Sequence, residues 1–240
     1  MKLRLDQLLM DRGLAPSRER AQRLIMAGMV LVEGQKSDKP GNATKDDAKV
    51  ELLVACPYAS RGGYKLAGVL DEFQIDPAGR VCLDAGSSTG GFTDCLLQRG
   101  AARVYAYDVG TGLLDWKLRN DPRVVVREGT NVRYLTPADL PEQISLVVCD
   151  VSFISVTLIV PAVVPVLTET GEMAILIKPQ FEAPRECVGR GGIVRDPEVH
   201  RQVIEKVTRF VRSYHFETAV IPSPILGAEG NQEFLLYAHH

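Results

Sequence analysis

The sequence predicts an α/β fold, a doubly wound parallel sheet, preceded by a small α+β domain at the N-terminus. Residues 1–58 contain short helix and strand patterns closed by turns. From residue 59 to residue 240, short apolar strands alternate with helix-length segments, which is typical of a parallel sheet covered on both faces. A glycine-rich turn directly follows the first of these strands, which indicates a ligand site at the carboxyl ends of the strands.

The sequence of the N-terminal region predicts two helices and two strands. A first short helix presents three leucines on one face and ends at Gly13. A second begins after Ser17, which serves as its N-cap, and ends at Gly28. Residues 29–32 read as a strand running into a turn, and residues 49–54 as a closing strand.

The segment 55–63 is predicted to link this region to the doubly wound domain. Helices are expected before the first strand, around Lys65, and at residues 91–99, 155–167 and 197–214. The expected strands cover residues 81–83, 103–107, 124–127, 146–149, 174–177 and 233–238.

The composition is that of an ordinary globular protein, with 45% hydrophobic and 24% charged residues and a formal net charge of −2. Residues 1–60 hold 10 Lys and Arg against 8 Asp and Glu, a balance that weakly favours a polyanionic partner. Five cysteines form no C-x-x-C pair, and the four histidines have no metal-ligand spacing with them. The pattern favours reduced thiols in a cytoplasmic protein and no metal site.

Residues 151–168 form an 18-residue stretch without a charge, which raises the alternative of a membrane-active protein. The stretch contains Pro161 and Pro165 and is shorter than the roughly 20 apolar residues that span a bilayer. A strand end, a loop and a buried helix explain it better. No stable membrane insertion is therefore expected.

The strongest motif is the turn DAGSSTGGF, residues 84–92, between a strand and a helix. Its glycines allow a tight turn and a close approach of the backbone to a ligand. The spacing is neither G-x-G-x-x-G nor that of a P-loop, and an acidic residue at its start suits a cationic, amino-acid-bearing ligand. The candidate binding residues are Asp84, Gly86, Ser87, Ser88, Thr89, Gly90, Gly91 and Phe92.

Asp108 ends the next strand, 24 residues after Asp84. This is about where a carboxylate accepts hydrogen bonds from ribose hydroxyls in nucleoside-binding sheets. The alternative is a helix-capping loop with a surface aspartate. The strand–loop–helix context favours nucleoside binding.

At these residues the chain resembles a known family. DAGSSTGGFTD is similar to the first adenosylmethionine motif of FtsJ-like ribose 2'-O-methyltransferases. LDQLLMDRGLAPSRERAQRLIMAGMVLVEG resembles an S4 domain, and SRGGYKL, CDVSFIS, IKPQFE and GNQEFLL match later blocks in order. Together they resemble the TlyA group, which also carries the label hemolysin.

The resemblance implies a Rossmann-like methyltransferase sheet at residues 59–240 and an S4-like RNA-binding domain at residues 1–58. It implies S-adenosyl-L-methionine as cofactor and cytidine ribose in ribosomal RNA, alone or within ribosomal subunits, as substrate. Asn131, in GTNVR after the third strand, is a further candidate contact to the adenosine. A non-catalytic RNA-binding module that has lost its cofactor is a further alternative, which the intact glycine turn disfavours.

The family's catalytic Lys-Asp-Lys-Glu tetrad matches Lys65, Asp150, Lys178 and Glu233. Asp150 and Lys178 follow adjacent expected strands, and Glu233 begins the last one. A ribose 2'-hydroxyl is a poor nucleophile until its proton is removed or its developing charge is stabilised. We expect Lys178 to have that role with help from Lys65, while the two acids orient the lysines. This chemistry requires no metal.

The candidate RNA-binding residues are arginines at the N-terminus, beside Lys2. Arginine forks match phosphate oxygens, and A-form RNA is recognised largely through its backbone and shape. The alternative is a solvated helix face, because Asp11 and Glu19 dilute the positive charge. The candidates are Arg4, Arg12, Arg18, Arg20 and Arg23.

Overall fold

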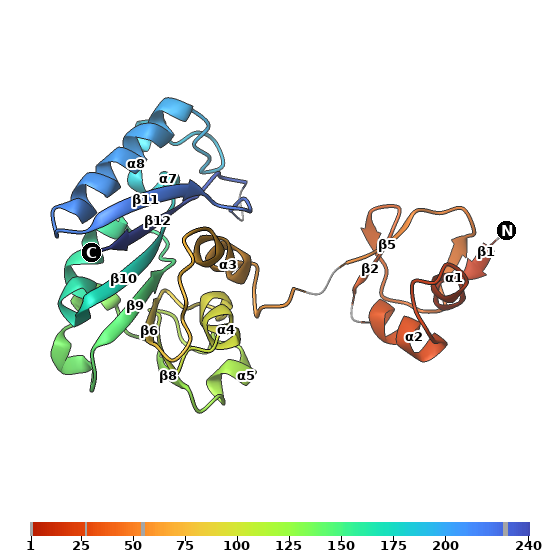
Figure 1. Ribbon diagram of the computed structural model, residues 1–240. Coiled ribbons are helices and arrows are strands. Elements are labelled where there is room, and N and C mark those ends of the chain that lie inside the picture. Colours follow the sequence, from red (N-terminus) through yellow and green to blue (C-terminus); the bar gives the residue numbers. More distant parts are fainter. Residues whose placement is uncertain (1, 27, 54–55, 228–229) are drawn as a thin grey trace. The chain divides into compact units, whose positions relative to one another are not determined.

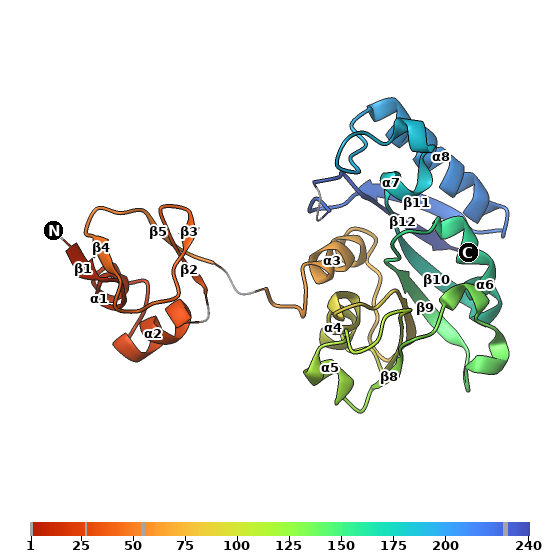
Figure 2. The same ribbon diagram turned by 180° about the vertical axis from the view of Figure 1, so that it is seen from behind.

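The computed structural model describes residues 2–26, 28–53, 56–227 and 230–240. The chain divides into two compact units, residues 1–57 and 58–240 (Figures 1 and 2). Residues 54 and 55, at the end of the expected closing strand and the start of the expected linker, lie outside the described residues. The expected linker, residues 55–63, extends too far, because the first helix of the second unit already begins at Gly62.

The N-terminal unit packs two helices against two small sheets. Strand β1 pairs with β4, and β2 lies between β3 and β5, all antiparallel. The two expected helices and both expected strands are confirmed, whereas β1, β3 and β4 were not predicted. The elements are β1 Lys2–Arg4, α1 Leu5–Asp11, α2 Arg18–Met26, β2 Val30–Val32, β3 Gln35–Lys36, β4 Ala43–Lys45 and β5 Val50–Leu52.

The second unit contains a seven-stranded sheet in the order β11-β12-β10-β9-β6-β7-β8. The strands are β6 Val81–Ala85, β7 Arg103–Tyr107, β8 Val124–Arg127, β9 Ile144–Cys149, β10 Leu167–Ile177, β11 Glu217–Pro222 and β12 Phe234–His239. The six expected strands are confirmed, and β11 was not predicted.

The sheet is mixed rather than wholly parallel. Strands β6 to β10 are parallel to one another, but β12 runs antiparallel to both β10 and β11. The chain crosses over through a long helix to β11 at the edge and then returns, so that β12 fills the space between β11 and β10. A direct return between neighbouring strands is necessarily antiparallel, because a parallel pair needs a crossover connection.

Helices cover both faces of the sheet. Helices α3 Gly62–Glu72 and α4 Gly91–Gln98 share one core cluster, and α6 Val160–Val163 and α8 Pro197–Arg212 share the other. Figures 1 and 2 show the sheet between these two groups. The alternation of strand-length and helix-length segments in the sequence therefore predicted the layers correctly.

The expected helix at residues 155–167 was wrong in detail. The structure has three short turns, η3 Val156–Leu158, α6 and η4 Val164–Val166, and β10 already begins at Leu167. Pro161 and Pro165 each lie in the first turn of a new helix, where a missing N–H costs nothing. Val156, Ile159 and Val160 from this stretch are buried in the core, which accounts for its apolar character.

Across the described part of the chain, no helix is both long and apolar enough to cross a bilayer. The same residues contain no group of three His, Cys, Asp or Glu side chains that could hold a metal ion.

Candidate active site

A cavity of about 490 Å³ lies at the carboxyl ends of β6, β7 and β9. This volume falls within the range of small-molecule and cofactor sites. Of the candidate cofactor residues, Gly86, Ser88, Asp108 and Asn131 line the cavity. The remaining candidates do not line it: Asp84, Ser87, Thr89, Gly90, Gly91 and Phe92.

The glycines of the turn are required by protein packing. Gly86 has φ +88°, and a Cβ atom there would lie 2.5 Å from the backbone oxygen of Asp150. At Gly90, with φ +96°, it would lie 2.2 Å from Cδ1 of Leu118. L side chains disfavour these backbone angles. At Gly86 the added atom would also meet backbone, whereas at Gly90 it would meet the ends of leucine side chains. The turn therefore packs directly against the segment that carries Asp150.

Asp84 lies fully buried below the turn's backbone at the end of β6. Thr93 donates a hydrogen bond of 2.6 Å to its Oδ2 atom, while Oδ1 has no hydrogen-bond partner among the described residues. Burial raises the pKa of Asp84 to about 7, and the nearby charges of Asp150 and Asp108 act in the same direction. An unpartnered buried oxygen is uncommon and is suited to accept a hydrogen bond from a ligand.

Asp108 and Asn131 both support loops and border the cavity. The Asp108 carboxylate accepts the backbone N–H groups of Ser88, at 2.8 Å, and Gly110, at 2.7 Å. Asn131 accepts the backbone N–H of Arg133 and so caps a short 3-10 helix, η1 Val132–Tyr134. An ionised carboxylate has about four lone-pair sites, so Asp108 can hold its loop and still accept ribose hydroxyls.

The four tetrad residues form two ion pairs at this edge of the sheet. Lys65 Nζ lies 2.6 Å from Glu233 Oε2, and Lys178 Nζ lies 2.6 Å from Asp150 Oδ1. Lys178 also donates a 2.8 Å hydrogen bond to Ser152 Oγ. Asp150 lines the cavity, so this second pair adjoins it.

Strand direction explains why residues so distant in the sequence meet. Because β12 is antiparallel to β10, its first residue lies at the carboxyl end of β10, and Ile177 pairs with Phe234. Lys178 and Glu233 follow that pair, at the same end of the ladder. Lys65, which the sequence placed on the helix before the first strand, lies on α3 as expected.

The two ion pairs are largely shielded from water. The exposed fraction of the side chain is 11% for both lysines, 3% for Glu233 and 19% for Asp150. Charges in such surroundings interact more strongly than at the surface, and removal of one partner leaves the other charge uncompensated. The site thus holds two lysine side chains in defined positions at this edge of the sheet, and one of them is paired with cavity-lining Asp150.

Sequence reasoning did not single out several residues of the site. Ser152 and Phe153 line the cavity, and Phe153 has φ +64° and is 91% exposed. Buried Glu182 accepts hydrogen bonds of 2.7 Å from both the Ser155 hydroxyl and the Val156 backbone. The CDVSFIS and IKPQFE motifs contain these residues, but no local pattern shows which side chains turn inward.

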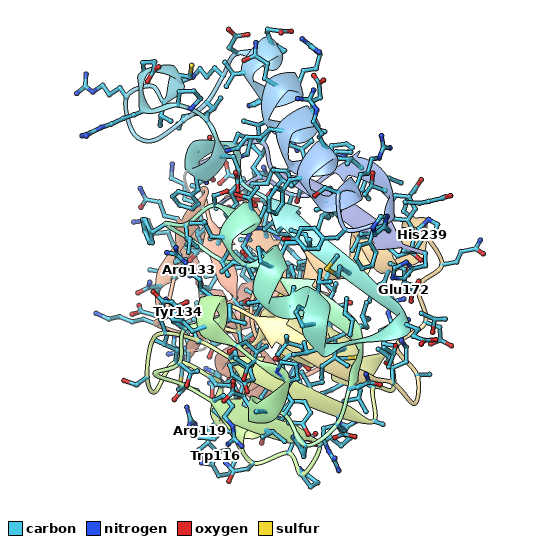
Figure 3. All side chains as sticks on the ribbon, turned by 90° about the vertical axis from the view of Figure 1, so that its left-hand side faces the viewer. Trp116, Arg119, Arg133, Tyr134, Glu172 and His239 are labelled. Carbon is cyan, nitrogen blue, oxygen red and sulfur yellow. The ribbon has the colours of Figure 1, made fainter. Side chains whose placement is uncertain are left out.

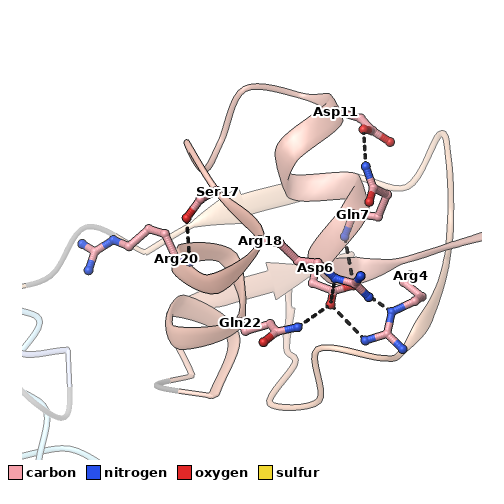
Figure 4. Close-up of polar contacts among 8 residues, drawn as sticks. All are labelled: Arg4, Asp6, Gln7, Asp11, Ser17, Arg18, Arg20 and Gln22. Carbon is pink, nitrogen blue, oxygen red and sulfur yellow. Dashed lines mark hydrogen bonds and ion pairs between the residues drawn. The ribbon is translucent and has the colours of Figure 1, made fainter.

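In the N-terminal unit, three of the five candidate RNA-binding arginines contact the unit's own residues. Arg4 and Arg18 donate to the carboxylate of buried Asp6 (Figure 4). The Arg4 guanidinium contributes most to holding the pKa of Asp6 well below its usual range. Arg12 donates to backbone oxygens of Ala48 and Asp46.

These arginines keep part of their surface open to solvent. About half of the Arg4 and Arg18 side chains is exposed, and Arg20 and Arg23 are exposed as well. Arg20 contributes its backbone N–H to Ser17 Oγ, the expected helix cap (Figure 4).

Comparisons with known proteins agree with this architecture. The family model described as FtsJ-like methyltransferase matches residues 58–240, and the S4 domain model matches residues 3–42. The 16S/23S rRNA (cytidine-2'-O)-methyltransferase TlyA of Mycobacterium tuberculosis is 45% identical over 98% of this chain and 89% of its own. Hemolysin A of Brachyspira hyodysenteriae is 41% identical over 98% of this chain and 99% of its own.

A solved structure from Streptococcus thermophilus is 44% identical, with a TM-score of 0.77, and the match covers 99% of this chain and 88% of that one. The mixed sheet, its cavity and the two family matches define an S-adenosylmethionine-dependent methyltransferase with an S4 domain. Within that class, the chain belongs to the TlyA/hemolysin A family.

The site fits the cofactor of this class. Asp108 and Asn131 line the cavity with groups that accept hydrogen bonds, and buried Asp84, just before the turn, has a carboxylate oxygen without a partner among the described residues.

Proposed function

We propose that this protein methylates the 2'-oxygen of a cytidine ribose in ribosomal RNA, with S-adenosyl-L-methionine as methyl donor. The observation that carries the proposal is the Lys178–Asp150 pair, in which Asp150 also lines the cofactor cavity. A group able to activate a hydroxyl therefore adjoins the cofactor pocket. The printed activity of the M. tuberculosis relative supports the choice of substrate.

The cofactor, when bound, supplies a methyl group activated by its positively charged sulfur. The protein's own residues align the ribose and manage the proton and the charge. With the cofactor bound, the Lys178–Asp150 pair would take up the 2'-hydroxyl proton as the oxygen accepts the methyl group that the cofactor supplies. Lys65, held by Glu233, stabilises the negative charge that develops on the oxygen.

The N-terminal unit is proposed to bind the RNA. Arg4, Arg12, Arg18, Arg20 and Arg23 combine exposed guanidinium surface with positions fixed by the unit's own contacts. Guanidinium groups already held in place lose less freedom when they bind phosphates. The proposed partner is the ribosomal subunit or its RNA, in the cytoplasm.

The test is transfer of labelled methyl groups to ribosomal subunits, followed by mass mapping of the modified nucleotides. Methyl groups on a cytidine 2'-oxygen are the expected result. Label on a base, or none on RNA while the cofactor binds, would overturn the reaction type. A liposome leakage assay on the same preparation addresses the hemolysin name, and leakage at low protein concentration would contradict the view that residues 151–168 serve the core.

A further inference from the structure

We propose that residues 184–195, between α7 Pro179–Glu182 and α8, form an arm that binds the RNA phosphate backbone beside the target nucleotide. Asn231 fixes this arm to the strand that follows catalytic Glu233. The inference rests on the proposed function and adds a second RNA contact, located on the methyltransferase unit. Figure 3 shows the segment between α7 and α8 projecting from the body of that unit.

The arm carries positive charge that the protein does not neutralise. Arg185, Arg190 and Arg195 are exposed, and none forms an ion pair or side-chain hydrogen bond with another described residue. The only acid within the arm is Glu186, which is exposed too. The carboxylate of Asp196, just beyond it, accepts the backbone N–H of Glu198 as the N-cap of α8.

Neighbouring arginines on α8 behave differently. Arg201 pairs with Glu198 at 2.6 Å, and Arg209 pairs with Glu205 at 2.6 Å. Both are exposed, so exposure alone does not explain the unpaired guanidiniums of the arm. An arginine without an acidic partner is the side chain best suited to bind a phosphate through two parallel hydrogen bonds.

The arm has a defined backbone. Gly189 and Ile193 form a β-bridge, and Gly191 and Gly192, with φ +77° and +74°, make the turn between them. Cys187 and Val188 pack against the core cluster under α8. A loop with this much internal structure presents its guanidiniums without a large further loss of conformational freedom.

Asn231 holds the arm at its base. This side chain is 1% exposed, accepts the Val194 backbone N–H at 2.9 Å and donates to the Gly192 backbone oxygen at 2.8 Å. It lies two residues before Glu233. The side-chain oxygen and nitrogen of Asn231 both form hydrogen bonds with the arm. This structural role accounts for the asparagine of the GNQEF motif without a contact between Asn231 and the substrate.

The position of the arm suits an RNA strand bound for catalysis. On one side it continues from Lys178 through α7, and on the other it is joined through Asn231 to the segment that carries Glu233. A nucleotide whose ribose reaches these residues brings its neighbouring phosphates to the same edge of the sheet. Phosphate contacts of this kind set the register of a nucleic acid without reading its sequence.

The test compares Arg185→Ala/Arg190→Ala with the matched pair Arg201→Ala/Arg209→Ala. Binding of ribosomal RNA is measured over a series of salt concentrations. Each lost phosphate contact lowers the slope of log K against log salt by roughly 0.7–0.9, so the arm variant should lose about 1.5 in slope and about tenfold or more in affinity at low salt. The α8 variant should keep the wild-type slope, and both should bind S-adenosylmethionine normally in calorimetric titration.

An unchanged slope in the arm variant, or an equal loss in the α8 variant, would overturn the proposal. Normal RNA binding with loss of affinity for an acidic protein would also reject it and indicate a protein partner. Failure of the proposed function is a separate outcome, seen in the wild type as absence of 2'-O-methylation. A loss confined to the variants tests the arm alone.

Asn231→Ala gives an independent check through the anchor. Hydrogen exchange of the Val194 amide should speed up, and the KM for RNA should rise more than kcat falls. Unchanged exchange at Val194, or a fall in kcat alone, would show that Asn231 does not act through the arm.

Discussion

The backbone oxygen of Asp150 lies 2.5 Å from the position that a Cβ atom on Gly86 would occupy. The Asp150 N–H also donates to the Ala85 oxygen at 2.9 Å, so the glycine turn and the segment that carries Asp150 are in direct backbone contact. The glycine turn that lines the cavity and the segment that carries the Lys178–Asp150 pair are therefore built as one unit. A displacement of either segment disturbs both.

Gly86→Ala should consequently weaken both cofactor binding and methyl transfer. The new methyl group meets backbone atoms rather than a flexible side chain, so the turn must shift, and φ +88° adds strain. We expect about tenfold or greater loss of S-adenosylmethionine affinity in calorimetric titration. Gly79→Ala is the control, because Gly79 has φ +71° but no atom within 4 Å of the added Cβ. Equal effects of the two substitutions would show that backbone strain alone is responsible.

Lys178→Ala should lower kcat by about 10²–10⁴, the usual contribution of a positioned acid–base group. Cofactor affinity should change little, because Lys178 does not line the cavity. The measurement is single-turnover methyl transfer together with cofactor titration. Lys117→Ala, at an exposed position on α5 Trp116–Arg119, controls for loss of a lysine from the unit. Near-normal transfer by Lys178→Ala would remove this residue from the centre of the mechanism.

Glu182→Ala should loosen the segment that carries Ser152 and Phe153. The buried carboxylate holds Ser155 and Val156 and is paired with Lys206 at 3.2 Å. Its loss leaves buried donors unsatisfied, at a cost of about 1–3 kcal/mol in the free energy of unfolding. Thermal unfolding and kcat should both fall, whereas Glu186→Ala, in the exposed arm, should leave the Tm within about a degree of wild type. A stable Glu182→Ala variant with full activity would refute this role.

Asp84 gives the stability of the protein a specific pH dependence. Its pKa is raised from the ordinary 3.8 to about 7 by burial, so the folded state keeps this proton to a higher pH than the unfolded chain does. Stability from this group is therefore lost as the pH rises from about 4 to about 7, by up to about 1.4 kcal/mol per unit. The Asp84→Asn variant lacks this titrating group. Its free energy of unfolding should therefore rise relative to that of the wild type as the pH increases over this range. The measurement is the free energy of unfolding as a function of pH, and parallel curves for the two proteins would contradict the prediction.

In the N-terminal unit, Asp6→Asn should destabilise the helices that Asp6 joins. The Arg4 guanidinium and neighbouring donors hold the pKa of Asp6 below its usual range, so its contribution is present above pH 4 and is lost as the pH falls. Because Arg4 and Arg18 are half exposed, we expect a loss of only about 1–3 kcal/mol. Hydrogen exchange at buried Leu9 and Ile25 measures it. Asp11→Asn, which affects one exposed hydrogen bond to Gln7, is the control.

The sequence by itself determined the layers, the strands that carry the site and the identity of the candidate groups. The apolar strands, the glycine turn after Leu83, and the charged residues that follow two strands, Asp150 and Lys178, are local patterns. Local patterns report burial and backbone angle directly, because both depend on neighbouring residues. Pro161 and Pro165 are equally local signals, and they divide the expected helix at residues 155–167 into shorter ones.

Only the tertiary structure decided which groups meet. Lys65 pairs with Glu233 across 168 residues of sequence, and this requires β12 to enter the sheet in reverse beside β10. The contacts of Arg4 and Arg18 with Asp6, and of Asn231 with the arm, likewise join separate elements. Such pairings depend on strand order, strand direction and side-chain rotamers. No repeating pattern in a single stretch of sequence encodes them.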